Sequence, residues 1–390
     1  MKHFVKKVFL IGFTMFLSVL YAQESKLSFS EKEYNKPTSK DGEFVLVGDV
    51  GGTWTRFALC EFAKEKCKIN FTMHFKSGEI TDFAPVVKQV IEYANEKYSV
   101  SVECASFAVA GPVSGKRDFC PLTNLFWDID AKKVLELTKL KSAVLLNDFE
   151  AIGYGVEAID SKNLIDISWS KDVVANRDKD AHFNKVVIGA GTGLGKCVLV
   201  WDVLLQQYRV VSSEGGHADF AVHTKEEFVL KEFVSKNVCD NAPVRWEDML
   251  SGRGIQSIYT FLEYSGEYES TPCAKEIKES GYDAGVIAQH KDKDACCRTT
   301  FDMFAKIYGR AAKNFALEEL AVGGVYIAGG IAAKNLDIFK KETFDFEFLN
   351  NRTHRKSILE KTPVFVVTDE DVGLYGAAVF AQLMKKQAEL

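Results

Sequence analysis

Two segments of the chain, residues 48–59 and 189–199, repeat one pattern about 140 residues apart. Each contains an apolar run, a glycine-rich turn, one basic residue and a second apolar run. This order predicts two strands joined by a tight turn, because glycine adopts backbone conformations that other residues rarely adopt. A duplicated α/β unit that faces its copy across a cleft explains the repeat. Chance similarity between two glycine turns is the alternative.

Predicted strands and helices alternate along the rest of the chain. Short apolar runs predict buried strands, and apolar residues at helical spacing predict helices. The pattern restarts near residue 150, so we expect an α/β fold in which helices pack on a mixed sheet in each half. The predicted strands cover residues 44–48, 57–60, 69–74, 104–110, 143–146, 186–188, 197–201, 325–328 and 364–368, and the helices residues 84–98, 131–140, 225–237, 253–264, 299–320 and 373–383.

Length and charge limit the possible functions. A chain of 390 residues suits two domains or one large domain, since a domain averages roughly 150 residues. Its 47% apolar and 26% charged residues are typical of a globular protein. The net charge of −5 lacks the basic footprint of a nucleic-acid binder, so we expect no nucleic-acid partner.

The first 43 residues differ from the rest. Three lysines precede residues 8–22, which are uncharged, mostly apolar and end at Ala22. This layout is typical of a secretory signal peptide, and the run is too short to span a bilayer comfortably. The alternative is an extension that is never used as a signal. Residues 23–43 are polar, and we expect them to form a tether outside the fold.

The nine cysteines indicate a different compartment. Their number is odd, and the chain has no Cys-x-x-Cys pair. These features are typical of reduced, buried thiols in an intracellular protein. Asn70 and Asn351 begin N-glycosylation patterns, which are short and common by chance.

The first glycine turn has the residues of a phosphate site. Gly51 and Gly52 allow backbone N–H groups to approach an anion, Thr53 adds a hydroxyl, and Arg56 adds a positive charge. Asp49, at the end of the preceding strand, can hold a metal-bound water. An ordinary hairpin turn is the alternative for the glycines alone.

The second turn contains Gly191, Thr192, Gly193 and Gly195. It lacks the P-loop pattern, and a strand follows it where a dinucleotide-binding fingerprint requires a helix. Two turns of the phosphate-binding kind, one in each half, predict a single nucleotide held between the halves.

Two groups of polar residues can act on a second ligand. Asn147 and Asp148 close a predicted strand, where a carboxylate can orient a hydroxyl and accept its proton, or where the pair can cap a helix. Glu214 and His217 can hydrogen-bond several sugar hydroxyls at once, with a metal site as the alternative. Glu247 alone is unremarkable and fits a solvated helix face equally well.

Taken in order, these motifs resemble the bacterial-type glucokinase family of ATP-dependent sugar kinases. The resemblance runs from about residue 44 to about residue 385. Single motifs are weak signals, but the ordered set is specific. It also includes residues 110–113, 122–129, 251–252 and 326–331.

The resemblance implies a two-lobed actin-like, RNase H-like sugar kinase fold with a central cleft. A small α/β domain would cover residues 44–158 and be completed by a C-terminal helix at 369–390, and a large α/β domain would cover 159–368. The family also implies a homodimer. The Phe-rich helix at 299–320 is a candidate interface, although a core helix explains its composition better.

The resemblance also implies a site for glucose, ATP and Mg²⁺. Asn147, Asp148, Glu214, His217 and Glu247 match the glucose-binding positions, and Asp148 matches the catalytic base. The two glycine turns would hold the ATP phosphates, Gly329 and Gly330 would lie near the adenosine, and Asp49 would contact Mg²⁺ through water.

The expected function is therefore phosphorylation of D-glucose to glucose 6-phosphate, the first step of glycolysis. The alternatives are a kinase of another hexose, such as mannose or an N-acetylhexosamine, and a non-catalytic nucleotide- or sugar-binding protein of the actin-like class. A secreted binding protein is motivated by the leader alone. Because a kinase needs ATP, we expect a cytoplasmic enzyme without a membrane anchor.

Overall fold

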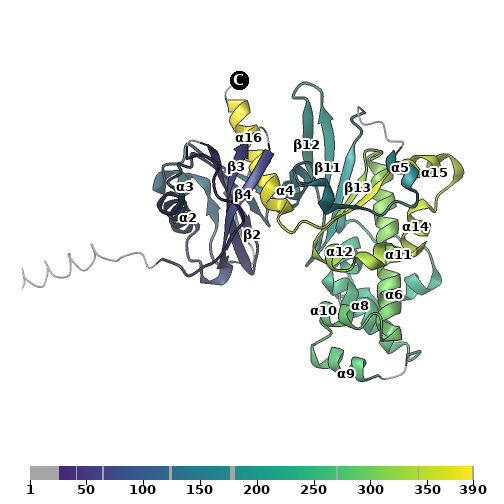
Figure 1. Ribbon diagram of the computed structural model, residues 1–390. Coiled ribbons are helices and arrows are strands. Elements are labelled where there is room, and N and C mark those ends of the chain that lie inside the picture. Colours follow the sequence, from purple (N-terminus) through teal and green to yellow (C-terminus); the bar gives the residue numbers. More distant parts are fainter. Residues whose placement is uncertain are drawn as a thin grey trace, which may run out of the picture.

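The computed structural model describes residues 26–40, 42–63, 66–122, 125–175, 181–268, 271–340 and 342–388. The signal-like segment predicted at residues 1–22 lies outside these ranges. Two lobes, each built on a six-stranded sheet, lie on either side of a helix pair, α4 (Asp148–Gly155) and α16 (Val372–Ala388) (Figure 1).

The first sheet has the strand order β1-β4-β3-β2-β5-β8. The pairs β1–β4, β4–β3 and β3–β2 are antiparallel, whereas β5 and β8 run parallel to β2. The strands are β1 (Ser30–Glu33), β2 (Glu43–Val50), β3 (Trp54–Ala63), β4 (Lys66–Lys76), β5 (Cys104–Val109) and β8 (Ser142–Asn147). The short pair β6 (Phe119–Cys120) and β7 (Ile129–Asp130) forms a separate ribbon.

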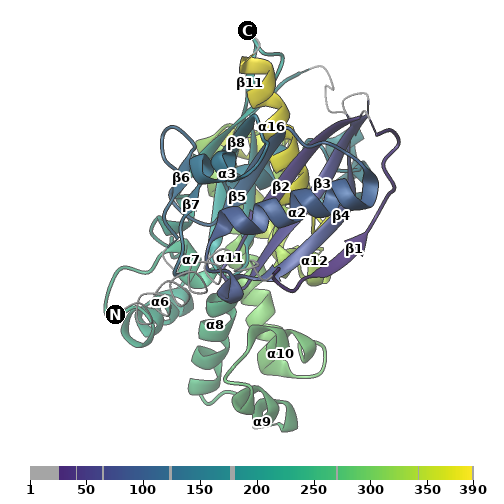
Figure 2. The same ribbon diagram turned by 90° about the vertical axis from the view of Figure 1, so that its left-hand side faces the viewer.

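Helices cover both faces of this sheet. α2 (Phe83–Tyr98) and α3 (Ala131–Leu137) pack on one face, and α16 lies on the other (Figure 2). The sequence of β2 is apolar without alternation because both faces of this strand are buried. Leu46 belongs to the core under α2, whereas Val45 and Val47 belong to the core shared with α16.

The second sheet has the order β12-β11-β10-β13-β14-β9. Its strands are β9 (Leu164–Asp166), β10 (Lys185–Ala190), β11 (Leu194–Asp202), β12 (Gln207–Ser213), β13 (Val325–Ala328) and β14 (Val364–Val367). The helices of this lobe are α5 (Lys171–Ala175), α6 (Lys225–Asn237), α7 (Trp246–Met249), α8 (Gly252–Tyr264), α9 (Pro272–Glu279), α10 (Ala284–Gln289), α11 (Ala295–Glu318), α12 (Gly330–Lys334), α13 (Leu336–Phe339), α14 (Glu342–Leu349) and α15 (Thr353–Leu359). Single 3-10 turns occur at Ser77–Glu79, Ser161–Asn163 and Gly215–His217.

The two sheets confirm the internal duplication. In each, an antiparallel hairpin is followed across the sheet by two parallel strands: β3, β2, β5 and β8 in one, and β11, β10, β13 and β14 in the other. The two glycine turns join the strands of the equivalent hairpins, β2–β3 and β10–β11. The predicted α/β fold is therefore correct, and every strand and helix predicted from the sequence is present.

The long Phe-rich helix, α11, lies in the core of the second lobe. Phe301, Phe304 and Phe315 are almost completely buried, which favours the core interpretation over the interface. Arg310 on the same helix is fully buried. Its guanidinium donates to Glu227 at 2.6 and 2.8 Å and to Glu347 at 3.2 Å, so the buried charges are paired.

Two glycines allow the helix pair between the lobes to pack closely. A Cβ at Gly376 of α16 would lie 1.7 Å from the carbonyl oxygen of Ala151, and one at Gly155 of α4 would lie 2.0 Å from that of Val372. The core around this pair contains residues from both sheets, including Val47 of β2. The helix pair therefore joins the two lobes.

The structure corrects the expectation that residues 23–43 form a tether outside the fold. Ser30–Glu33 forms strand β1, which pairs with β4 at the edge of the first sheet. All four of its side chains are exposed, so no apolar pattern predicts it; backbone hydrogen bonds carry the pairing. Among the described residues, no helix has the length and apolar character needed to cross a membrane.

Candidate active site

The first glycine turn lies at the carboxyl edge of the first sheet. Val50, Val109 and Asn147 sit side by side in the register of the parallel strands β2, β5 and β8. The Gly51–Gly52 turn after β2 and the Asn147–Asp148 segment after β8 therefore leave the sheet at the same edge. In open α/β sheets this edge is where ligands bind.

Ser77, which the sequence analysis missed, supports the first turn. Its hydroxyl donates to the Gly51 carbonyl at 2.7 Å, and its backbone N–H donates to the Thr53 carbonyl at 3.0 Å. A Cβ at Gly52 would meet no atom within 4 Å, so this part of the turn faces open space. Ser77 thus fixes the conformation of the turn, and the side of the turn at Gly52 is accessible to a ligand.

Arg56 is held by two carboxylates. Its Nη2 donates to Oδ2 of Asp49 at 2.6 Å, and its Nη1 donates to Oδ1 of Asp371 at 3.2 Å. Asp49 and Arg56 are directly opposite each other on β2 and β3. Both line a cavity of about 410 Å³ together with Ser30, Gly51, Trp54 and His74. Contact of Arg56 with phosphate stays a prediction.

The second turn is shaped by Glu247. Its Oε2 accepts a hydrogen bond from Leu194 N–H at 3.1 Å, and a Cβ at Gly193 would lie 2.4 Å from the same oxygen. The Gly191 carbonyl accepts from Gly252 N–H at 2.9 Å, which ties the turn to the start of α8. Thr192 at the tip is exposed. Glu247 on α7 thus supports the second turn and is largely buried, where the sequence analysis considered a solvated helix face.

Gly329 and Gly330 follow β13, next to the second turn. Gly329 has a φ of +90°, and a Cβ there would lie 2.5 Å from the Ala190 carbonyl oxygen. Both the conformation and the close approach require glycine at this position. β13 pairs in parallel with β10, so these glycines and the Gly191 turn leave adjacent strands at one edge.

Asn147 and Asp148 begin helix α4, and Asn147 is its N-cap. The Asn147 side-chain oxygen accepts from Phe149 N–H at 2.9 Å and from Glu150 N–H at 3.2 Å. The capping interpretation is therefore correct for Asn147. It does not compete with a role for Asp148, because the cap fixes the carboxylate at the helix start.

Burial raises the pKa of Asp148 to about 6, and the nearby charge of Asp49 acts in the same direction. Hydrogen bonds from Phe149 N–H, at 2.8 Å, and from the Asn147 side chain partly oppose this shift in pKa. A carboxylate with such a pKa is mostly ionised at neutral pH and is a better proton acceptor than an ordinary aspartate. A strongly shifted pKa in a cleft is typical of a functional site.

Glu214, His217 and Glu247, which the sequence predicts to bind glucose, lie together. His217 Nδ1 lies 3.0 Å from Oε2 of Glu214, and its Nε2 lies 3.5 Å from Oε2 of Glu247. Glu214 is mostly exposed, whereas Glu247 is largely buried. The His217 imidazole thus lies between the exposed carboxylate of Glu214 and the carboxylate of Glu247, which contacts the second turn.

Asn147 and Glu214 line one cavity of about 330 Å³, although they belong to different lobes. Arg117 and Glu150, which the sequence analysis missed, also line it. Arg117 donates to both oxygens of Glu150 at 2.9 and 2.8 Å. This bidentate pair braces the first turn of α4, which carries Asp148.

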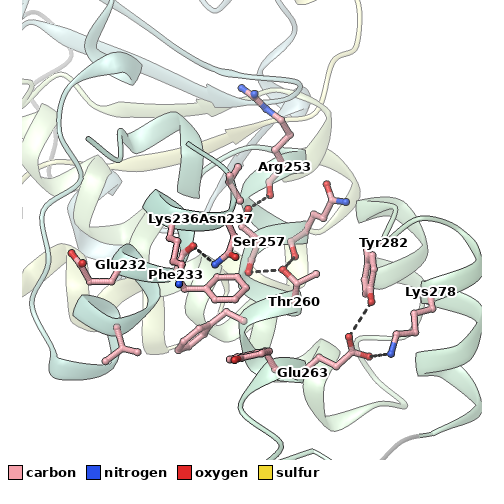
Figure 3. Close-up of a pocket in the computed structure, with 15 residues that line it drawn as sticks. Glu232, Phe233, Lys236, Asn237, Arg253, Ser257, Thr260, Glu263, Lys278 and Tyr282 are labelled. Carbon is pink, nitrogen blue, oxygen red and sulfur yellow. Dashed lines mark hydrogen bonds and ion pairs between the residues drawn. The ribbon is translucent and has the colours of Figure 1, made fainter. Parts of the chain in front are cut away.

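A larger cavity, of about 1210 Å³, lies between α6, α8 and the segment from α9 to Tyr282 (Figure 3). Its polar side chains bond to one another, as Glu263 does with Lys278 and Tyr282. None of the predicted site residues lines it. Arg253 at its rim donates to Glu247 at 3.2 Å, so the cavity adjoins the site without forming it.

A set of three or more His, Cys, Asp or Glu residues that could hold a metal ion does not occur in the described part of the chain. Asp49 offers a carboxylate beside the first turn, and both of its bonds from Arg56 go to Oδ2. A lone carboxylate suits Mg²⁺ held mainly by phosphates and water.

Two sheets of one topology, two glycine turns and a half-buried carboxylate at the start of α4 define a two-lobed sugar kinase of the actin-like class. The sequence model of the glucokinase family matches residues 46–384. The chain belongs to the glucokinase family.

Individual relatives agree with this assignment. The glucokinase of Trichormus variabilis is 34% identical over 352 residues, which cover 86% of this chain and 98% of the relative. The crystal structure of a glucokinase from an Antarctic psychrotroph has a TM-score of 0.71 at 26% identity, and the match covers 87% of this chain and 99% of that one. A glucokinase of the ROK family from Streptomyces griseus, solved with glucose and AMPPNP, has a TM-score of 0.55 at 18% identity, with coverage of 87% and 99%, and shows the fold alone.

Proposed function

We propose that this enzyme transfers the γ-phosphoryl group of ATP to the 6-hydroxyl of glucose, with Asp148 as the base. The observation that supports the proposal is the position of Asp148. Its pKa is raised to about 6, it begins α4 at the junction of the lobes, and its neighbour Phe149 lies against Gly195, which follows the second turn in β11. The base would accept the hydroxyl proton as the oxygen attacks phosphorus.

The two glycine turns bind the nucleotide in this proposal. The open face of the Gly51–Gly52 turn and the exposed Thr192 offer backbone N–H and hydroxyl donors to the phosphates. Gly329 and Gly330, on the strand beside the second turn, lie near the adenosine. Each lobe thus supplies one turn, so lobe closure brings the donor and the acceptor together and excludes water.

Asp49 would hold Mg²⁺ through a water, and the ion would offset charge that develops during transfer. Arg56 keeps the Asp49 carboxylate in place through its two bonds to Oδ2. Positioning and electrostatics, rather than covalent chemistry of the protein, supply most of the rate in such reactions.

Glucose binds in the proposed mechanism through Asn147, Glu214, His217 and Glu247. Asn147 and Glu214 line the same cavity, and His217 joins Glu214 to Glu247. Carboxylates accept hydrogen bonds from sugar hydroxyls, and the imidazole can donate or accept. Together these groups would orient the 6-hydroxyl towards Asp148.

We further propose that the enzyme acts in the cytoplasm as a homodimer, with domain boundaries near residues 158 and 369. All nine cysteines are free. Asn70, the first glycosylation candidate, is fully buried in β4, which opposes modification of the folded chain. Cell fractionation and light scattering of the purified protein test the location and the oligomeric state.

A coupled assay of ADP release with a panel of sugars tests the proposal. We expect glucose to give the highest kcat/KM. If mannose or an N-acetylhexosamine gave a higher kcat/KM, that sugar and not glucose would be the preferred substrate. Nucleotide binding without sugar-dependent ADP release would contradict catalysis and favour a binding protein.

A further inference from the structure

The N-terminal arm (residues 26–39) precedes the part of the chain that the family model matches, which starts at residue 46. Its strand β1 pairs with β4 and forms the outer edge of the first sheet (Figure 2). The cross-strand row from β1 through β4 and β3 to β2 contains Ser30, His74, Arg56 and Asp49. Strand β1 of the arm is thus separated from β2, which contains Asp49, by the two strands β4 and β3.

One side of the arm is anchored to α2. The backbone of Leu27 makes two hydrogen bonds with the Gln89 side chain, at 3.0 and 2.9 Å. Lys97 donates to Glu31 at 2.6 Å, and the Tyr98 hydroxyl donates to Glu33 at 2.9 Å. These contacts hold the arm to α2.

The other side of the arm reaches the proposed nucleotide site through Tyr34. The Tyr34 hydroxyl donates to Oδ2 of Asp371 at 2.7 Å, while Nη1 of Arg56 donates to Oδ1 of the same carboxylate at 3.2 Å. Nη2 of Arg56 donates in turn to Asp49 at 2.6 Å. Four side chains thus form one continuous chain of hydrogen bonds, from the arm to the carboxylate before the first glycine turn.

We propose that Tyr34 is a positioning residue for nucleotide binding, which acts through Asp371 and Arg56 on Asp49. The inference rests on the proposed role of Asp49 and the adjacent turn in binding MgATP. Arg56 is a planar, fork-shaped donor shared by two carboxylates, so its orientation depends on both. Asp371 immediately precedes α16. The hydrogen bond from Tyr34 fixes the Asp371 carboxylate, which also accepts a hydrogen bond from Arg56.

Loss of the Tyr34 hydroxyl should therefore loosen Arg56 and, with it, Asp49. A single hydrogen bond contributes about 0.5–1.5 kcal/mol, which corresponds to roughly 2–13-fold in an equilibrium constant. Because the effect passes through two intermediate side chains and ends at Asp49, it should appear in MgATP binding rather than in glucose binding.

Tyr34→Phe tests the inference, with Tyr98→Phe as the matched control. Each substitution removes one phenol hydroxyl that holds the arm and keeps the ring: Lys32 covers the Tyr34 ring, and Phe71 stacks on the Tyr98 ring. We expect Tyr34→Phe to raise the KM for MgATP about 3–10-fold and to leave the KM for glucose within about twofold. Tyr98→Phe should leave both constants within about twofold at a comparable melting temperature.

A double-mutant cycle tests the route. Asp371→Ala should raise the KM for MgATP, and adding Tyr34→Phe to it should have little further effect, because the alanine already breaks the chain of hydrogen bonds. Equal constants for Tyr34→Phe and Tyr98→Phe, or additive effects in the cycle, would overturn the inference while the wild-type activity stands. Absence of glucose-dependent ADP release from the wild-type enzyme would instead contradict the proposed function, and the inference with it.

Discussion

The ring of Phe149 lies directly against Gly195, so closely that a Cβ on the glycine would stand 2.0 Å from the ring. Phe149 follows the proposed base on α4, and Gly195 is the second residue of β11, just after the second glycine turn. The contact joins the acceptor side of the site to the nucleotide side across the two lobes. The position of Asp148 relative to the second turn therefore depends on a residue without a side chain.

Gly195→Ala should disturb this contact. The methyl group cannot be accommodated without displacing the ring or the turn, so we expect a loss of about 1–3 kcal/mol in the free energy of unfolding and a lower kcat. Gly78→Ala is the matched control, because a Cβ there meets no atom within 4 Å. Denaturant unfolding and steady-state assays measure both effects. Equal stability and activity of the two variants would show that Phe149 adapts freely.

Activity should fall in acid because the base must be ionised. Burial raises the pKa of Asp148 to about 6, so kcat/KM should decrease about tenfold per pH unit well below 6. The charge of Asp49 also raises this pKa, so Asp49→Asn should move the acid limb to lower pH while reducing the overall rate. A flat profile between pH 5 and 7 would exclude Asp148 as the titrating base.

The same pKa shift predicts how stability depends on pH. Asp148 binds its proton more tightly in the folded state, so its contribution to stability falls as the pH rises from about 4 to 6 and stays low above that range. Asp148→Asn removes this half-buried charge, and its stability relative to wild type should therefore increase over this interval. Thermal melts at pH 4.5 and 7.5 measure the change.

Substitutions in the proposed glucose-binding residues should weaken sugar binding much more than nucleotide binding. Glu214→Gln and His217→Ala each remove hydrogen-bonding capacity towards the sugar, at about 1–3 kcal/mol, or roughly 5–150-fold in affinity. Calorimetry should show this loss for glucose and much less for ATP. His354→Ala, at an exposed position of α15, is the control for loss of an imidazole. Equal losses for both ligands would indicate a structural role.

The buried charges around α11 predict a large effect on stability. Arg310→Met removes the buried guanidinium that pairs with both Glu227 and Glu347, which should cost about 3–5 kcal/mol. Arg298→Met, on an exposed position of the same helix, should change the free energy of unfolding by less than about 0.5 kcal/mol. Urea unfolding compares the two, and similar midpoints would show that the buried ion pairs contribute little.

The fold and the family could be predicted because their signals are local. The apolar runs of β2 and β10 and the glycine turns after them are continuous in sequence, and Asp148 is recognisable beside Asn147 at the end of a strand. What the sequence does not indicate is tertiary. Asp371 is 315 residues from Arg56, and β1 has four exposed side chains and pairs through its backbone alone.

The measurement that tests the central claim most directly is the turnover of Asp148→Asn. The amide keeps the shape of the side chain but cannot accept a proton at neutral pH, so we predict that kcat falls about 10²–10⁴-fold. Glucose affinity, measured by calorimetry on the same folded variant, should stay within about threefold. A variant that binds glucose and retains more than half of the wild-type kcat would contradict the assignment of Asp148 as the catalytic base.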